Sequence, residues 1–148
     1  MQVYKVSDIK FKNLLTKKVL ADLEEFFPLN MQEEILQNIN DYVYFTVADS
    51  YGYQGFIALK ELDNTLEIKA MGVLKARQRT KLGSALIKAS VDYAKVNNKK
   101  LISINIKDDS SKDPNYLKTR RFLSKQGFAN VTVLETEIAP ILVMCYVI

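Results

Sequence analysis

Residues 74–86, LKARQRTKLGSAL, have the residue types and the spacing of a phosphate-binding turn. Four cations alternate there with neutral residues: Lys75, Arg77, Arg79 and Lys81. Small residues follow from Gly83 onward, where a helix would begin and expose its first amides. Free amides and the helix dipole favour an anion at such a position, and glycine lets the backbone come close to a ligand. The stretch predicts an anion site, with a solvated basic turn as the alternative.

The titratable residues limit the chemistry that could take place beside such a site. The sequence has no histidine and one cysteine, Cys145, so the usual general base and the commonest metal ligand are missing. We expect no metal, and any acid–base step must use carboxylates, tyrosine, lysine, Cys145 or water. Because Cys145 alternates within an apolar final strand, we interpret it as an inert buried thiol.

Length and composition indicate a single domain over residues 1–148, with one core. The 48% hydrophobic and 26% charged residues are typical of a soluble globular protein. Neither a signal-peptide pattern nor an apolar run of membrane-spanning length occurs, so we expect a cytoplasmic protein without a membrane partner. The net charge of +4 suits phosphorylated small molecules or nucleic acid equally well.

Two helices precede most of the predicted strands. After a short strand at 3–6, apolar residues recur at helical spacing over 11–27, and Pro28 ends that helix. Asn30 with Glu33 three residues later is typical of a capping box, so a second short helix is predicted to begin at Asn30.

Three strands are predicted next. The β-branched and aromatic runs 42–48 and 54–59 flank a turn and predict a hairpin. A third strand covers 65–74, with Gly72 as a candidate bulge or splay point. The helix that carries the phosphate turn then runs over 82–97.

The C-terminal part alternates strands and helices. The apolar run 101–106 predicts a buried strand, parallel to its neighbour because a helix connects them. Asp113 and Pro114 have the types preferred at the start of a helix, and Gly127 suits the left-handed position after its end. Two final strands are predicted, at 130–135 and 141–147.

The phosphate turn resembles the acyl-CoA pyrophosphate loop of the GCN5-related N-acetyltransferases (GNAT). That loop reads Gln or Arg, x, x, Gly, x, Gly or Ala, and here Gln78 and Gly83 match it. Lys81 stands where the first glycine usually is. We interpret Lys81 as a first-turn helical residue that needs no positive φ and adds charge to the rim of the site.

A second motif and the order of elements support the resemblance. Residues 121–128, RFLSKQGF, resemble the family's fourth-helix motif Phe-Tyr-x-x-x-Gly-Phe through Phe122, Gly127 and Phe128, with Leu123 in place of the tyrosine. The resemblance implies an α/β (α+β) fold: a mixed, mostly antiparallel, splayed sheet of about seven strands flanked by about four helices.

The resemblance also implies where acetyl-CoA would bind as co-substrate. It would lie in the gap between the strand ending near Gly72 and the strand 101–106, with its pantetheine arm against the backbone of Met71 and Val73. The loop implied to hold its pyrophosphate consists of Gln78, Arg79, Thr80, Lys81, Leu82, Gly83 and Ser84.

Acetyl transfer to a primary amine in a ternary complex is the implied reaction, and two residues are candidates for proton transfer. Glu67 lies eleven residues before Gln78, which matches the base of histone-acetylating members; an ordinary exposed strand residue is the alternative. Leu123 replaces the tyrosine that protonates the departing thiolate, and Tyr116, two turns earlier on the same helix, is the nearest substitute, with core packing as its alternative role.

The acceptor is expected to be an amine on a small molecule or a protein, bound by a monomer or a homodimer. The resemblance implies a groove for it between the first two helices and the last two strands. An acidic rim could be formed there by Glu24, Glu25, Glu33, Glu34, Glu135 and Glu137, with ordinary solvated surface charges as the favoured alternative. A degenerate acyl-CoA-binding module without turnover is one alternative function. A nucleic-acid-binding domain is less favoured; it would use tyrosines for stacking, namely Tyr42, Tyr44, Tyr51 and Tyr53.

Overall fold

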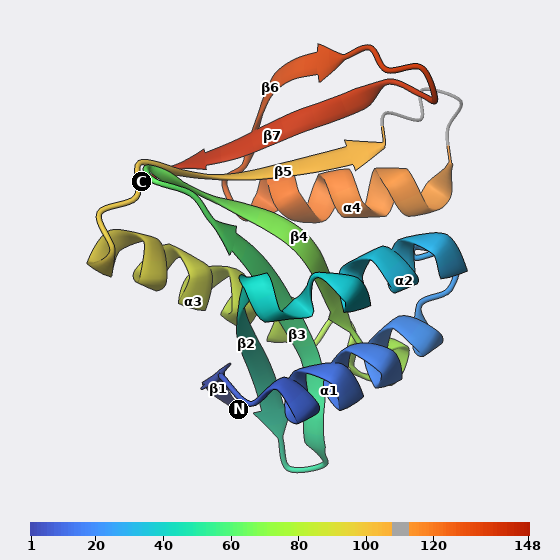
Figure 1. Ribbon diagram of the computed structural model, residues 1–148, viewed down its shortest axis with the longest axis vertical. Helices are drawn as coiled ribbons and strands as arrows, with labels where there is room; N and C mark the ends of the chain where they lie inside the picture. Colours follow the sequence, from blue (N-terminus) through green and yellow to red (C-terminus); the bar gives the residue numbers. More distant parts are fainter. Residues whose placement is uncertain (108–112) are drawn as a thin grey trace.

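The computed structural model describes residues 1–107 and 113–148, which form one mixed sheet with helices on both faces (Figure 1). The elements in chain order are β1 Gln2–Val6, α1 Ile9–Asp22, α2 Leu29–Gln37, η1 Ile39–Asp41, β2 Tyr42–Asp49, β3 Gly52–Glu61, β4 Thr65–Val73, η2 Lys75–Arg77, α3 Leu82–Val96, β5 Leu101–Lys107, α4 Pro114–Lys125, β6 Ala129–Leu134 and β7 Ile141–Val147. This arrangement confirms the predicted fold class.

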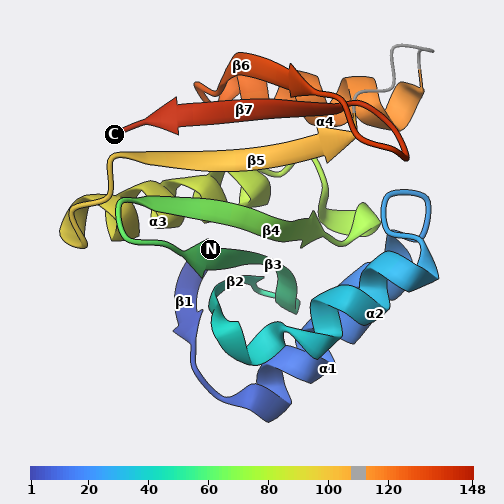
Figure 2. The same ribbon diagram turned by 45° about the horizontal axis from the view of Figure 1, so that its top comes forward.

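The sheet has the strand order β1-β2-β3-β4-β5-β7-β6, and among the described strands only the β4–β5 pair is parallel. That pair is short: residues 65–68 of β4 pair with residues 101–104 of β5. Beyond Ile68 and Ile104 the ladder ends and the two strands diverge (Figure 2), while β4 continues to pair with β3 as far as Val73. The predicted splay is therefore present, and it begins after Ile68.

Gly72 is not the bulge that its place in a strand predicted. It pairs regularly with Phe56, and the irregularity in the β3–β4 ladder lies earlier in the strand, where Lys69 is the extra residue. A side chain on Gly72 would place its Cβ 2.7 Å from Leu23 Cδ1 and 2.9 Å from Val19 Cγ1. Glycine is needed here because α1 packs directly against the strand.

The two faces of the sheet have separate cores. Helices α1 and α2 cover one face, with Leu15, Val19 and Ile35 in its core. Helices α3 and α4 cover the other, where Leu86 and Leu123 pack against inward-facing residues of β3, β4, β5 and β7. Helices therefore lie on both sides of the diverging ends of β4 and β5. The predicted cofactor loop follows β4, so it lies where the sheet and the helices on its two faces meet.

The ends of the first two helices differ from the prediction. Helix α1 ends at Asp22, and residues 23–27 form turns and a bend instead of continuing to Pro28. Helix α2 begins at Leu29, with Asn30 inside it, so the capping box is wrong. The reason is that Pro28 takes the cap position, and its carbonyl accepts from the amides of Met31 and Gln32 at 2.9 and 3.0 Å.

The predicted ends of α4 are confirmed. The Asp113 side chain accepts a hydrogen bond from the Asn115 amide at 3.0 Å, Pro114 occupies the first turn, and Gly127 has a φ of 102°. Among the helices of residues 1–107 and 113–148, none is both long and apolar enough to span a membrane.

Candidate functional site

The phosphate turn joins β4 to α3 through the short helix η2 and two left-handed residues. Arg79 has a φ of 66° and Lys81 a φ of 68°. Lys81 is the residue immediately before α3 and has no helical backbone. The interpretation of Lys81 as a helical residue without positive φ is therefore wrong: the side chain is that of lysine, but the backbone has the conformation that glycine adopts most readily.

The first turn of α3 presents its amides without a capping side chain. In the described part of the chain no side chain caps this helix, and the first amide with a helical partner is that of Ala85, which donates to the Lys81 carbonyl at 3.1 Å. The Ser84 hydroxyl is turned toward α4, where it accepts from Gln126 Nε2 at 2.9 Å. The amides of Leu82, Gly83 and Ser84 are thus available to an anion.

The four cations of the turn differ in what they contact. Lys75 pairs with Glu25 at 3.0 Å, and this hydrogen bond lowers the pKa of the Glu25 carboxyl. Arg77 pairs with Asp49 at 3.3 Å. Arg79 and Lys81 are exposed and have no acidic partner among the described residues, so these two supply the net positive charge at the start of α3.

Gly83 lies where α3 meets both α4 and β4. A Cβ at this position would be 3.1 Å from Phe122 Cζ and 3.4 Å from Met71 Cε. Residues from both sequence motifs and from the predicted pantetheine strand therefore meet at one point. Glycine at 83 is favoured by this tight packing and is also suited to a ligand that approaches the backbone.

Met71 and Val73 lie on the part of β4 that has left β5. They pair with Ile57 and Gly55 of β3 on one side, and the described residues offer no strand partner on the β5 side. Their side chains pack into the core beneath α3. Core packing of the side chains is compatible with backbone pairing to pantetheine, and that pairing stays a prediction.

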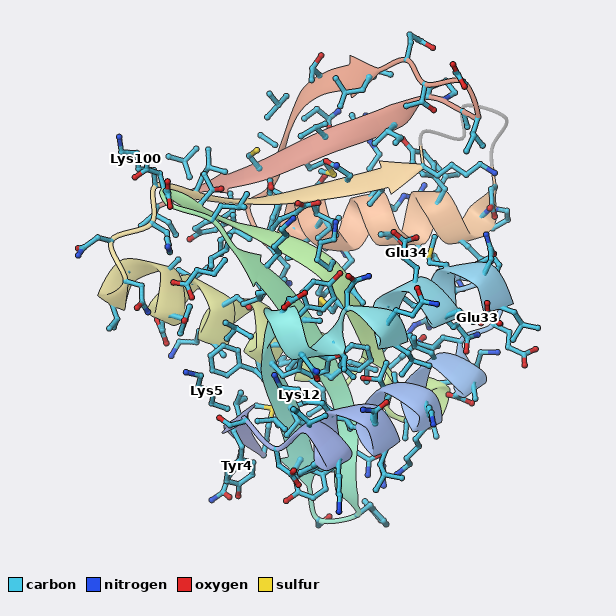
Figure 3. All side chains as sticks on the ribbon, viewed as in Figure 1. Tyr4, Lys5, Lys12, Glu33, Glu34 and Lys100 are labelled. Carbon is cyan, nitrogen blue, oxygen red and sulfur yellow. The ribbon has the colours of Figure 1, made fainter. Side chains whose placement is uncertain are left out.

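Glu67 lies at the end of the parallel ladder, one residue before the strands diverge. It pairs with Ser103 of β5, its carboxylate is half-buried, and Lys69 Nζ is 3.2 Å away. Glu67 also acts on Tyr42, whose pKa is raised chiefly by burial and further by the charges of Glu34, Glu67 and Asp41, against an opposing effect of Lys69. Figure 3 shows Glu34 on α2, the helix that lies across this face.

These groups place Glu67 on the α2 side of the sheet, beside other polar side chains and next to the divergence of the strands. A carboxylate in this position can accept a proton from an amine that approaches from the α2 side. Its role as a base stays a prediction.

Tyr116 lies inside the core that α4 covers. Its side chain is buried, and Leu123, two turns along the same face of the helix, is 1% exposed. Both belong to the cluster beneath α3 and α4. Burial supports the packing role for Tyr116, and proton donation by Tyr116 stays a prediction.

Cys145 is the residue that could act as a nucleophile. Cys145 is half-buried in β7 beside Ser103, and burial raises the pKa of its thiol, which disfavours the nucleophilic thiolate.

The four tyrosines considered for nucleic-acid binding do not form one surface. Tyr42 and Tyr44 are buried, so they form no stacking surface for bases, and only Tyr51 and Tyr53 of that set are exposed.

Nothing in the sequence indicates that four residues contact the turn between β4 and α3. Asp22 Oδ2 accepts from the Lys75 amide at 2.7 Å, Glu25 pairs with Lys75, and Asp49 and Tyr51 both contact Arg77. These partners lie 26 to 53 positions away in the chain, and each is an ordinary turn or helix-end residue in its own segment. Only the folded arrangement of α1 and the β2–β3 hairpin brings them to the loop.

Comparisons with known proteins agree with this geometry. A sequence profile described as the Acetyltransferase (GNAT) family matches residues 13–128. A comparison with curated proteins found no match. A GNAT family acetyltransferase from Elizabethkingia anophelis, solved with acetyl-CoA bound, is similar with a TM-score of 0.76 and 15% identity, over 99% of this chain and 97% of its own.

Two further solved structures have the same fold. The aminoglycoside 6'-N-acetyltransferase from Enterococcus faecium has a TM-score of 0.76 and 17% identity, over 99% of this chain and 97% of its own. The ribosomal-protein-S18-alanine N-acetyltransferase from Escherichia coli has a TM-score of 0.71 and 14% identity, over 99% of this chain and 93% of its own. At such identities the likeness shows a shared fold.

Proposed function

The chain belongs to the GNAT family of acetyltransferases, and from this premise we propose that it transfers the acetyl group of acetyl-CoA to a primary amine. The observation that carries the proposal is the start of α3: uncapped amides, two left-handed residues and the two exposed cations Arg79 and Lys81. Amides, helix dipole and unpaired cations together suit a pyrophosphate.

The binding of acetyl-CoA would use the loop and the diverging strands. The amides from Arg79 to Ser84 hold the pyrophosphate, with Gln78 at the entrance of the loop, where its side chain donates to the Val73 carbonyl at 3.0 Å. The pantetheine arm lies along the backbone of Met71 and Val73, which pair with β3 and have no strand partner on the β5 side among the described residues. This brings the thioester to the point where β4 and β5 separate, next to Glu67.

Direct transfer in a ternary complex follows from this arrangement. The uncharged amine attacks the thioester carbonyl, a C–N bond forms, the C–S bond breaks, and CoA leaves as a thiolate. Glu67 takes the proton that the amine nitrogen loses, directly or through water. Solvent or Tyr116 protonates the thiolate, whose conjugate acid has an ordinary pKa of about 8.5. Positioning of the two substrates supplies much of the rate.

The acceptor is proposed to be an amine on a small molecule or a protein. One solved relative in fold is named for aminoglycosides and another for a ribosomal-protein alanine, so both classes are represented. The half-buried Glu67, with Glu34 and Asp41 close enough to act on the same Tyr42, suits a cationic acceptor. We also propose that residues 1–148 act as one domain in the cytoplasm, as a monomer or homodimer.

The test is binding followed by turnover. Acetyl-CoA at a hundred times its dissociation constant should add about 2.7 kcal/mol to the free energy of unfolding, measured by thermal shift and calorimetric titration. Release of free CoA would then be followed with small polyamines, aminoglycosides and peptides with a free amino terminus. The absence of binding at millimolar acetyl-CoA would refute the proposal. Binding without turnover on any amine would favour a degenerate acyl-CoA-binding module.

A further inference from the structure

The cofactor loop holds a backbone conformation that its own residues do not favour. Arg79 and Lys81 are both left-handed, although residues with side chains rarely adopt this conformation. Neither of the two is a glycine, and in the described residues no side chain caps the start of α3. Such conformations persist only where the surrounding structure imposes them, so the loop must be held from outside.

The tip of the β2–β3 hairpin makes the contacts that can do this. The Arg77 guanidinium lies 3.7 Å from the centre of the Tyr51 ring, and Arg77 Nε is 3.3 Å from Asp49 Oδ2. The other oxygen of Asp49 accepts from the Tyr51 amide at 2.8 Å. The Asp49 carboxylate is thus bonded to the backbone of Tyr51, and the ring and the carboxylate contact the face and the edge of the guanidinium.

Arg77 passes this restraint to the left-handed residues. Its amide donates to the Leu74 carbonyl at 2.8 Å, and its carbonyl accepts from the hydroxyl of Thr80. Thr80 lies between Arg79 and Lys81 in the chain, so a fixed Arg77 carbonyl fixes the residue that separates the two unusual conformations. Movement of Arg77 would release that hydrogen bond.

Exposure distinguishes this contact from ordinary packing. Tyr51 is 76% exposed, so burial of its ring does not account for its place against Arg77. Because the Arg77 charge is already paired with Asp49, this arginine is also the wrong candidate for a direct phosphate ligand. Asp22 holds the beginning of the loop through the Lys75 amide, and the hairpin tip holds its middle.

We propose that Asp49 and Tyr51 are positioning residues for acetyl-CoA binding: by holding Arg77 they keep residues 79–81 in the conformation that aims the amides of α3 at the pyrophosphate. This inference rests on the proposed function, because it assigns these residues to the same loop. It extends the site to a hairpin that the loop motif does not include.

The experiment compares three variants of the full chain. Tyr51→Leu removes the ring, Tyr51→Phe keeps it, and Tyr53→Leu truncates an aromatic residue of the same hairpin that contacts Phe11 and Tyr4 instead of Arg77. We expect Tyr51→Leu to weaken acetyl-CoA binding roughly three- to tenfold, since a partly exposed cation–π contact and the ordering it provides are lost. Tyr51→Phe should stay within about twofold of the wild type, and Tyr53→Leu should lower stability without changing the affinity.

A double-mutant cycle with Arg77→Ala tests the route through Arg77. If Tyr51 acts through Arg77, the double variant loses little more affinity than either single variant. Independent, additive losses would mean that Arg77 contacts the cofactor directly and would overturn the proposal. Equal losses in Tyr51→Leu and Tyr53→Leu, or in Tyr51→Leu and Tyr51→Phe, would overturn it too.

Hydrogen exchange of the free protein separates this inference from the proposed function. In Tyr51→Leu, the hydrogen-bonded amides of the loop, those of Arg77, Gln78 and Ala85, should exchange faster than in the wild type, whereas Tyr53→Leu should leave them unchanged. This readout needs no ligand, so it holds even if the wild type fails to bind acetyl-CoA. Unchanged exchange of these amides in Tyr51→Leu would show that the hairpin does not hold the loop.

Discussion

Gly83 and Phe122 lie so close together that a Cβ on Gly83 would come within 3.1 Å of the Phe122 ring. The two residues belong to separate sequence motifs, 39 positions apart, and they meet where α3, α4 and β4 converge. The small residue of the loop is therefore also a packing residue, and its substitution should affect stability as well as ligand binding.

Gly83→Val should lower the free energy of unfolding by about 1–3 kcal/mol, because a branched side chain must displace the Phe122 ring from a filled space. Acetyl-CoA affinity should fall with it. Urea unfolding gives the first quantity and calorimetric titration the second. In a Phe122→Leu background the same substitution should cost clearly less stability; an equal cost in both backgrounds would mean that the ring is not the obstacle.

Lys81→Gly should raise the free energy of unfolding by roughly 0.5–1 kcal/mol, because glycine adopts the left-handed conformation without the energetic penalty that lysine has. This net gain already allows for the greater conformational entropy of glycine in the unfolded chain, which opposes it. Lys81→Ala should give no such gain. The matched control is Lys88→Gly, an exposed lysine within α3, which should lose about 1 kcal/mol. Chemical denaturation of the three variants measures these changes in the free energy of unfolding. A decrease for Lys81→Gly would contradict the left-handed backbone of Lys81.

Glu67→Gln should lower kcat for amine acetylation by roughly a hundredfold, since the amide cannot take the amine proton. The dissociation constant for acetyl-CoA should stay nearly the same, because Glu67 lies beyond the loop that holds the pyrophosphate. Steady-state rates, measured with an amine that the turnover test identifies as an acceptor, give kcat. Asp92→Asn, an exposed carboxylate on α3 at the other face of the sheet, serves as the control. A variant that retains full kcat would return Glu67 to an ordinary strand residue paired with Lys69.

Alkaline pH should destabilise the protein through Tyr44. Burial raises the pKa of Tyr44 to about 12, and its hydroxyl lies 2.8 Å from Thr16 Oγ1. In the unfolded chain tyrosine loses its proton near pH 10, so between pH 10 and 12 the unfolded state is favoured and stability falls as pH rises, by about 1.4 kcal/mol per unit.

Tyr44→Phe provides the comparison for this pH effect. The difference in the free energy of unfolding between wild type and variant should shrink by about 1 kcal/mol from pH 10 to pH 11. The pKa of Tyr93 is also raised to about 12, but Tyr93 is present in both proteins and its contribution cancels. A difference that stays constant over this range would mean that Tyr44 titrates normally.

The sequence was sufficient for elements whose signals are local. Alternating β-branched residues predicted the β2–β3 hairpin, and Asp113 with Pro114 predicted the start of α4, because these preferences act within a few residues. The start of α2 was wrong because Pro28 competed with Asn30 for the cap position. Gly72 was misread as a bulge since the sequence does not show that Leu23 and Val19 lie above it.

The candidate site was predictable to the extent that it is one continuous loop. The stretch from Gln78 to Ser84 carries its own motif, and Glu67 is read from its spacing to that motif. The left-handed backbone of Lys81 was missed because a lysine gives no sign of positive φ. The contacts of Asp49 and Tyr51 with Arg77 could not be predicted, since they depend on how a hairpin tip meets a loop from another strand.

The four residue pairs between β4 and β5 are the only strand pairing that joins the two halves of the sheet in the described residues. The halves are also joined by the Lys100 amide, which donates to the Asn64 carbonyl at 2.6 Å, and by a shared apolar core that includes Ile68, Ile102 and Leu142. Hydrogen bonds fix a direction, whereas hydrophobic contacts do not. In mechanical terms the junction is a clamp closed at one end: backbone pairing sets the distance between β4 and β5 as far as Ile68 and Ile104, and beyond them side-chain packing sets it.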